Sequence, residues 1–155
     1  MRAVLTRVRS ASVAIAGEVV GKIGQGFLIL LGVGPEDDET HCRYLAEKCL
    51  GLRIFEDEQG KMNRSLEDVQ GQVLVVSQFT LYGNCRKGRR PSFTEAAPPE
   101  LGNHLYERFL ADCADLGFAP QHGQFGADMQ VESVNDGPVT LILDTQEMMN
   151  APRRG

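Results

Sequence analysis

Hydrophobic and polar residues alternate along the beginning of the chain with the period of a β-strand. The alternation predicts strands over residues 3–9, 12–16 and 18–23, with a turn at Ala16–Gly17 between the last two. The run FLILLGV at 27–33 is apolar without interruption, which indicates a strand buried on both faces. The chain therefore begins as a sheet.

The period then changes to that of two amphipathic helices. After the acidic segment GPEDDE, apolar residues recur at the spacing of one helix face. They are Cys42, Leu45, Ala46, Cys49 and Leu50. The second helix is predicted to begin at Pro98–Pro99 and to end at Gly117 as a C-cap. Its apolar stripe consists of Leu101, Leu105, Phe109, Cys113 and Leu116.

Strand patterns also lie between and after the two helices. They cover residues 52–55, 72–81, 118–124, 129–134 and 139–143. Many strands with two interposed helices predict an α+β fold with a mixed sheet. Residues 1–145 are expected to form a single domain, and 146–155 a flexible C-terminal tail.

Composition narrows the class of protein. A chain of 155 residues, 42% hydrophobic, can bury a core without metal or disulfide support. The net charge of −5 argues against a protein that coats nucleic acid indiscriminately. The N-terminus lacks a secretory signal, and the apolar run 27–31 is too short to cross a bilayer. We expect a soluble, cytoplasmic protein that does not contact membranes.

The cysteines and histidines do not form a metal or disulfide pattern. The four cysteines contain no CxxC pair, and the three histidines form no HxH or HxxxH set. Buried free cysteine behaves as a small hydrophobe, so core positions are the favoured interpretation. A zinc site or a Cys–His nucleophile assembled by the fold remains the alternative. We expect no metal and no cofactor.

The segment VLVVSQFTLYG at 73–83 is unusual for a core strand because Ser77, Gln78 and Thr80 interrupt its apolar pattern near the end. Regular pleating would place Gln78 and Thr80 on one face. A strand emerging into solvent explains this as well as a site does. A serine-hydrolase site at Ser77 is disfavoured because no GxSxG sequence surrounds it.

Two later segments carry further candidate chemistry. CRKGRRPSF brings four cations into a predicted loop, either as a solvated charge run or as a binding surface. They are Arg86, Lys87, Arg89 and Arg90. NDGP at 135–138 has the composition of a turn, and Pro138 removes a ladder donor. The sequence leaves open whether the Gly137–Pro138 bond is cis.

Together, SQFTL at 77–81, KGRRPSF at 87–93 and NDGPVT at 135–140 resemble the D-aminoacyl-tRNA deacylase family. The resemblance extends from RVRSASV near the start to VTLILDT near the end. It implies a homodimer with a barrel-like mixed sheet and active sites at the subunit interface. The substrate would be an aminoacylated tRNA.

The resemblance also assigns roles. Ser77 and Gln78 would bind substrate, and the backbone of Phe79 and Thr80 would stabilise the oxyanion, assisted by the 2′-hydroxyl of the tRNA. A Gly137–cisPro138 dipeptide from the partner subunit would hold the substrate amine and reject L-amino acids while accepting glycine.

By the same resemblance, Arg7 would support that dipeptide and Met129 would line the site. Arg86, Lys87, Arg89 and Arg90 would contact tRNA phosphates. The rival interpretations are a non-catalytic nucleic-acid binder that uses the same basic loop, and an esterase that uses Ser77.

Overall fold

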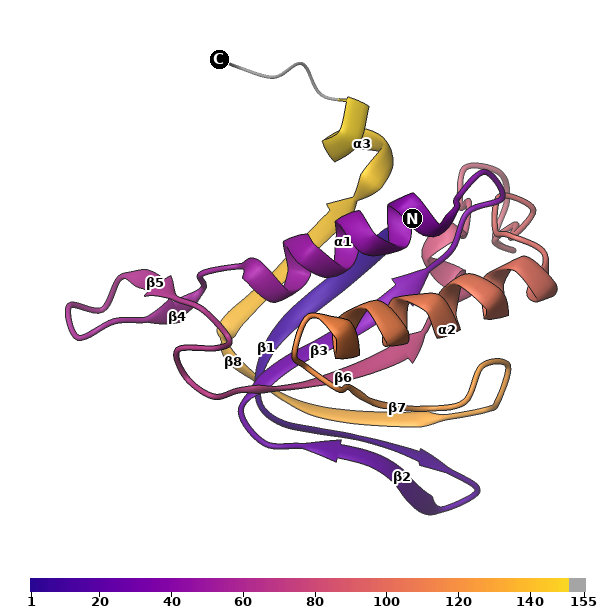
Figure 1. The fold of residues 1–155 in the computed structure, drawn as a ribbon. Helices are drawn as coiled ribbons and strands as arrows, with labels where there is room; N and C mark the ends of the chain where they lie inside the picture. The colour runs from indigo at the N-terminus through magenta and orange to yellow at the C-terminus, as the bar shows by residue number, and fades with distance from the viewer. Residues whose placement is uncertain (151–155) are drawn as a thin grey trace.

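A curved mixed sheet carries two helices on one of its faces (Figure 1). The computed structural model describes residues 1–150. The strands are β1 (Arg2–Ile15), β2 (Glu18–Ile23), β3 (Gly26–Gly32), β4 (Phe55–Glu56), β5 (Met62–Arg64), β6 (Gln72–Ser77), β7 (Gln121–His122) and β8 (Gln130–Asp144). The helices are α1 (Glu39–Gly51), α2 (Pro99–Asp115) and α3 (Thr145–Asn150), with a 3₁₀ turn η1 (Phe79–Tyr82).

The sheet follows the order β2-β1-β3-β6-β7, and β8 pairs with the other edge of β1. β1 is antiparallel to β2, β3 and β8, whereas β6 is parallel to β3 and to β7. Contacts between β2 and β7 nearly close the sheet on itself. The predicted α+β fold with a mixed, barrel-like sheet is therefore confirmed.

Two hydrophobic clusters lie on opposite faces of the sheet. Phe27, Ile29 and Leu31 pack with α1 and α2, whereas Leu28 packs with the cluster inside the curved sheet. Strand β3 is thus buried on both faces, as its unbroken apolar run predicts. The predicted stripes of both helices also lie in the core, with Leu45 of α1 and Phe109 of α2 fully buried. Helix α1 begins after Asp38, whose carboxylate accepts hydrogen bonds from the amides of Thr40 and His41.

Several predicted boundaries are wrong. β1 is one strand instead of two, and 129–134 and 139–143 belong to the single strand β8, because β1 and β8 pair along almost their whole lengths. Strands predicted at 52–55 and 118–124 shrink to Phe55–Glu56 and Gln121–His122.

The C-terminal segment differs in part from the predicted flexible tail. Residues Thr145–Asn150 form the short helix α3, and the Thr145 amide donates to the Met1 carbonyl oxygen at 2.9 Å. The remainder of the predicted tail, 151–155, lies outside the described residues. No helix within residues 1–150 is long and apolar enough to span a membrane.

Candidate active site

Strand β6 ends at Ser77, and the chain turns sharply into η1. The strand predicted to continue to residue 81 is therefore wrong at its end. The Gln78 amide makes the last bond to β3, donating to the Leu31 carbonyl oxygen at 2.7 Å. The 3₁₀ turn follows: the Leu81 amide donates to the Gln78 oxygen at 3.2 Å, and the Gly83 amide to the Thr80 oxygen at 2.9 Å. β3 itself ends at Gly32, so β6 has no further partner on that side.

The side chains of Gln78 and Thr80 come together because of this turn, and not because of regular strand pleating. The Gln78 side-chain amide donates a hydrogen bond to the Thr80 hydroxyl. Ser77 and Gln78 are half-buried, and Phe79 and Thr80 are exposed. None of the four side chains is an acid or a base that titrates near neutral pH. The segment can bind and polarise a substrate but lacks a general base of its own.

The backbone of η1 presents two unused donors to solvent. Within residues 1–150, neither the Phe79 amide nor the Thr80 amide donates a hydrogen bond. The first amides of a helical turn have no partner inside the turn, which explains why these two remain free. Two adjacent free N–H groups on an exposed segment can donate hydrogen bonds to a negatively charged oxygen.

The NDGP segment is a bulge within β8. Thr6 pairs with Thr140 and Val8 with Asn135, so residues 136–139 face the single residue Arg7. Asn135 closes the bulge, because its side-chain oxygen accepts from the Val139 amide at 2.9 Å. Gly137 has φ +134°, which favours glycine, and the Gly137–Pro138 peptide bond is cis.

Arg7 lies behind this bulge and is only 5% exposed. Its Nε donates to the Asp136 carbonyl oxygen at 2.9 Å, and its Nη1 donates to the Ile54 carbonyl oxygen at 2.7 Å. The carbonyl oxygen of Ile54, directly before β4, is therefore bonded to Arg7. A Cβ added to Gly137 would lie 3.0 Å from Nη2 of Arg7.

The dipeptide and η1 are far apart within one chain. Arg7, opposite the bulge, pairs with Phe27 of β3, which pairs with Val73 of β6. Ser77 lies four residues beyond Val73, or roughly 13 Å along the strand. β1 and β3 also lie between β8 and β6. The Gly137–Pro138 dipeptide therefore does not reach the Phe79–Thr80 amides of its own chain.

Met129 packs against the hydrophobic cluster inside the curved sheet. It is half-buried against the cluster that contains Leu74 and Val76. Val76 directly precedes Ser77, and the two are consecutive on β6. Met129 therefore packs on the inner face of the sheet.

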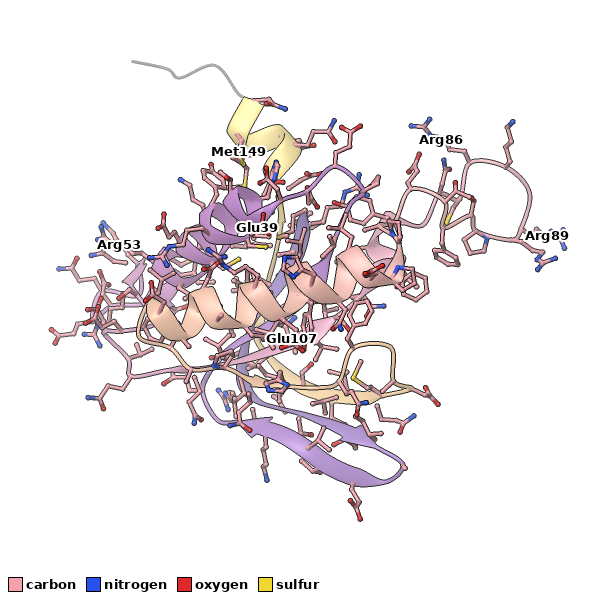
Figure 2. The ribbon with its side chains drawn as sticks, turned by 45° about the vertical axis from the view of Figure 1, so that its right-hand side comes forward. Glu39, Arg53, Arg86, Arg89, Glu107 and Met149 are labelled. Atoms are coloured by element: carbon pink, nitrogen blue, oxygen red, sulfur yellow. The ribbon has the colours of Figure 1, made fainter. Side chains whose placement is uncertain are left out.

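The basic segment forms a hairpin loop that leaves the body of the molecule (Figure 2). Paired hydrogen bonds between Asn84 and Ser92, 2.7 and 2.9 Å long, close its base. The four exposed cations on it form no ion pair within residues 1–150: Arg86, Lys87, Arg89 and Arg90.

Phe93 connects the hairpin loop to η1. Its ring meets the Phe79 ring edge-on, with the centroids 5.3 Å apart. Sequence reasoning did not single out this contact, although Phe93 ends the KGRRPSF motif. The basic loop and the free amides are thus neighbouring parts of one surface.

The remaining candidates for chemistry do not assemble a second site. Within the described part of the chain, no group of three or more His, Cys, Asp or Glu side chains could hold a metal ion. Cys42, Cys49 and Cys113 are buried, and burial raises the pKa of each thiol, which keeps it neutral. Cys85 is exposed at the base of the basic hairpin.

Comparison with known proteins identifies the family of this chain. The model of the D-Tyr-tRNA(Tyr) deacylase family matches residues 4–144, which is nearly the whole chain. The chain belongs to the D-Tyr-tRNA(Tyr) deacylase family. The family resemblance carried by SQFTL, KGRRPSF and NDGPVT is thereby confirmed.

Bacterial relatives of this deacylase family match at full length. A D-aminoacyl-tRNA deacylase of Thermosipho africanus is 56% identical over 148 residues, covering 96% of this chain and 99% of the relative. One from Desulfatibacillum aliphaticivorans is 59% identical over 146 residues, covering 94% and 100%.

Solved structures agree with the deacylase fold. A c-Myc DNA unwinding element binding protein has a TM-score of 0.87 and 42% identity, over 93% of this chain and 98% of its own. A probable eukaryotic D-amino acid tRNA deacylase has a TM-score of 0.80 at 18% identity, over 92% and 97%, a likeness that concerns the fold alone.

Proposed function

We propose that this protein hydrolyses the ester that links a D-amino acid to the 3′ end of tRNA. Its family and its full-length relatives support the reaction class. The observation that carries the mechanism is the pair of free backbone amides at Phe79 and Thr80. The cytoplasm, where tRNAs are charged, is the compartment in which this activity is useful.

The free amides bind the oxyanion of the tetrahedral intermediate. Removal of one such donor typically lowers the rate by roughly 10²–10³-fold. An aminoacyl ester is activated by the neighbouring ribose hydroxyl, and the 2′-hydroxyl of the tRNA assists the reaction, so a protein nucleophile is not required. Ser77 and Gln78 orient the substrate, and the Gln78 side chain holds the Thr80 hydroxyl.

The Gly137–Pro138 dipeptide distinguishes D-amino acids from L-amino acids. Its carbonyl groups accept hydrogen bonds from the α-amino group of the substrate, which fixes the amine and the ester together. The two remaining directions at the α-carbon then differ, and the backbone blocks the one that an L side chain takes. Glycine has no side chain to block, so glycyl-tRNA is also expected to be a substrate.

Such a site requires a second copy of the chain. The substrate amine and ester carbonyl are attached to the same carbon, whereas the dipeptide and η1 of one chain are roughly 13 Å apart along the strand direction alone. Two features of β8 favour a homodimer interface there. Within residues 1–150 its outer edge has no partner strand, and Val134 and Ile142 on it are 52% and 78% exposed.

The basic hairpin holds the tRNA. Its four unpaired cations lie on the loop that leads through Phe93 to Phe79, so phosphate contacts there would position the acceptor end at η1. Because the chain as a whole carries a net charge of −5, phosphate binding depends on a local group of cations such as this one.

A complementation experiment tests the shared site. Phe79→Pro removes one free amide at the first position of a helical turn, where proline is tolerated. Gly137→Val inserts a Cβ that would lie 2.8 Å from Val139 Cγ2. In a doubly tagged heterodimer of the two variants, one of the two sites is intact, so about half of the wild-type activity is expected. A site formed within one chain predicts no activity, and failure to recover heterodimers contradicts the dimer. Phe79→Ala, which keeps the amide, is the matched control.

A second candidate function is DNA binding, favoured by the 42% identity to a c-Myc DNA unwinding element binding protein. Salt-dependent affinity for duplex DNA, measured beside hydrolysis of D-tyrosyl-tRNA, separates the two functions. Tight DNA binding without release of D-tyrosine supports the binder. A generic esterase is tested by Ser77→Ala, which should retain deacylation if the backbone amides carry the chemistry.

A further inference from the structure

We propose that Arg2 is a positioning residue that fixes η1 so that the Phe79 and Thr80 amides face the substrate. This inference rests on the proposed oxyanion role of those amides. Arg2 lies on β1, outside the SQFT, KGRRPSF and GPVT segments, and contacts neither of the two amides.

Arg2, the first residue of β1, contacts three groups at once. Its Nε donates to the Asp144 carboxylate at 3.1 Å, and its Nη1 donates to the Leu81 carbonyl oxygen at 3.0 Å. Its guanidinium carbon lies 4.4 Å from the centroid of the Tyr82 ring. Leu81 and Tyr82 are the second half of η1, so the cation holds the turn directly behind Phe79 and Thr80.

Few other groups outside the segment hold η1. Within residues 1–150, Arg2 is the one side chain outside 77–83 that donates a hydrogen bond to it. The backbone contribution is the bond from the Gln78 amide to Leu31 before the turn begins. Loss of Arg2 would therefore leave the Leu81 end of η1 without a hydrogen bond from a side chain outside the segment, held by its packing on Gly32 and by its own short-range bonds.

The register of the sheet shows why Arg2 can do this. On β1, Arg2 pairs with Asp144 of β8 on one side and with Gly32 of β3 on the other. Gly32 has no side chain, and an added Cβ would lie 3.1 Å from Leu81 Cβ. η1 therefore packs on bare backbone beside Arg2, close enough for the guanidinium to reach over it.

The chemistry requires arginine. The planar guanidinium offers several fixed donors and can stack on an aromatic face at the same time, whereas a lysine ammonium is a single point charge. Burial raises the pKa of Tyr82, so its ring stays a neutral partner for the cation. The Asp144 side chain is 14% exposed, which limits screening of the ion pair by water.

The contacts of Arg2 also connect η1 of one proposed site to β8, the strand whose dipeptide would serve the other site of the dimer. Asp144 ends β8, the strand that carries Gly137–Pro138. Its second carboxylate oxygen accepts from the Gln146 amide at 2.9 Å, and the Thr145 amide bonds to Met1 at 2.9 Å. Arg2 thus joins η1 to the end of the strand that supplies the dipeptide.

Kinetics of Arg2→Gln give the first test. Since complete loss of one oxyanion donor lowers the rate by roughly 10²–10³-fold, imperfect placement should lower kcat by about 10–100-fold. KM for tRNA should change by less than about twofold, because the basic hairpin is untouched. The kcat of Arg2→Lys should lie between the kcat of Arg2→Gln and that of the wild type. Arg43→Gln, which removes ion pairs to Glu47 and Asp115 on the helices, is the matched control and should keep wild-type kcat.

Hydrogen–deuterium exchange gives a readout that does not depend on activity. In Arg2→Gln, and in Arg2→Lys if the first variant folds poorly, peptides covering 79–83 should exchange at least about tenfold faster, with α1 unchanged. Unchanged exchange in 79–83, or a loss confined to KM, overturns the proposal. If no aminoacyl-tRNA is hydrolysed even by wild type, the proposed function fails, while the exchange result still tests whether Arg2 fixes η1.

Discussion

Replacing Arg7 by methionine is the perturbation whose effect can be worked out most fully from the structure. Methionine keeps an unbranched apolar stem but cannot donate to the carbonyl oxygens of Asp136 and Ile54, which Arg7 binds at 2.9 and 2.7 Å. Arg7 is 5% exposed, so water has little access to replace those donors.

The expected magnitude follows from the two bonds. A hydrogen bond to a charged group contributes about 1.5–3 kcal/mol, so Arg7→Met should lower the free energy of unfolding by about 3–6 kcal/mol. For a chain of this size, that corresponds to a fall in Tm of roughly 6–24 °C. Because the dipeptide loses its support, hydrolysis of D-tyrosyl-tRNA should fall by about 10²-fold, the typical effect of a misplacement near 1 Å.

Arg9→Met is the matched control. Arg9 lies two positions along the same strand and approaches the same Asp136 at 3.5 Å, but its side chain is 75% exposed. An exposed pair of this kind contributes at most about 1 kcal/mol. Urea unfolding and single-turnover hydrolysis of both variants decide the matter. If Arg7→Met proves no less stable than Arg9→Met and deacylates normally, Arg7 does not support the dipeptide.

Three further predictions follow from other parts of the structure. Changing Arg86, Lys87, Arg89 and Arg90 together to alanine should raise KM for tRNA and reduce the slope of log affinity against log salt by roughly 3. Unchanged kinetics at every ionic strength would show that the loop is only a solvated surface. Gly32→Ala should lower the free energy of unfolding by about 1–3 kcal/mol and reduce kcat, because the added Cβ crowds η1. A Cβ added at Gly51 would meet no atom within 4 Å, so Gly51→Ala should keep kcat, and equal kcat in the two variants would contradict the packing argument. Burial, with a smaller effect of Asp112, raises the pKa of Cys42 and Cys113 from 9.0 to about 12. These folded pKa values lie above the unfolded one, so the stability they contribute is present below pH 9 and should decline between pH 9 and 12. Urea midpoints of the Cys42→Ala/Cys113→Ala variant should fall less over that window, and an equally steep fall would count against the thiols.

Features set by local periodicity could be predicted from the sequence. The stripes of α1 and α2 and the doubly buried β3 each depend on residues close together in the chain. The candidate segments at 77–80, 86–90 and 137–138 were recognisable from their resemblance to the deacylase family, and the polar residues of 77–80 also depart from the pattern of a core strand.

Features set by long-range pairing could not be predicted. The polar end of β6 leaves the sheet because β3 ends at Gly32, which the sequence of β6 does not encode. The NDGP segment resembles a turn between two strands, yet β1 is long enough to pair on both sides of it. Arg2 gave no local signal either, because its contacts depend on the register of β1 with β8 and on the space above Gly32.

The central claim is that main-chain groups, held in place by the fold, distinguish one stereoisomer of the substrate from the other. The most direct measurement is parallel hydrolysis of D-tyrosyl-tRNA and L-tyrosyl-tRNA by the purified protein under identical conditions. We expect rapid release of D-tyrosine and essentially no release of L-tyrosine; comparable rates for the two substrates would contradict the account.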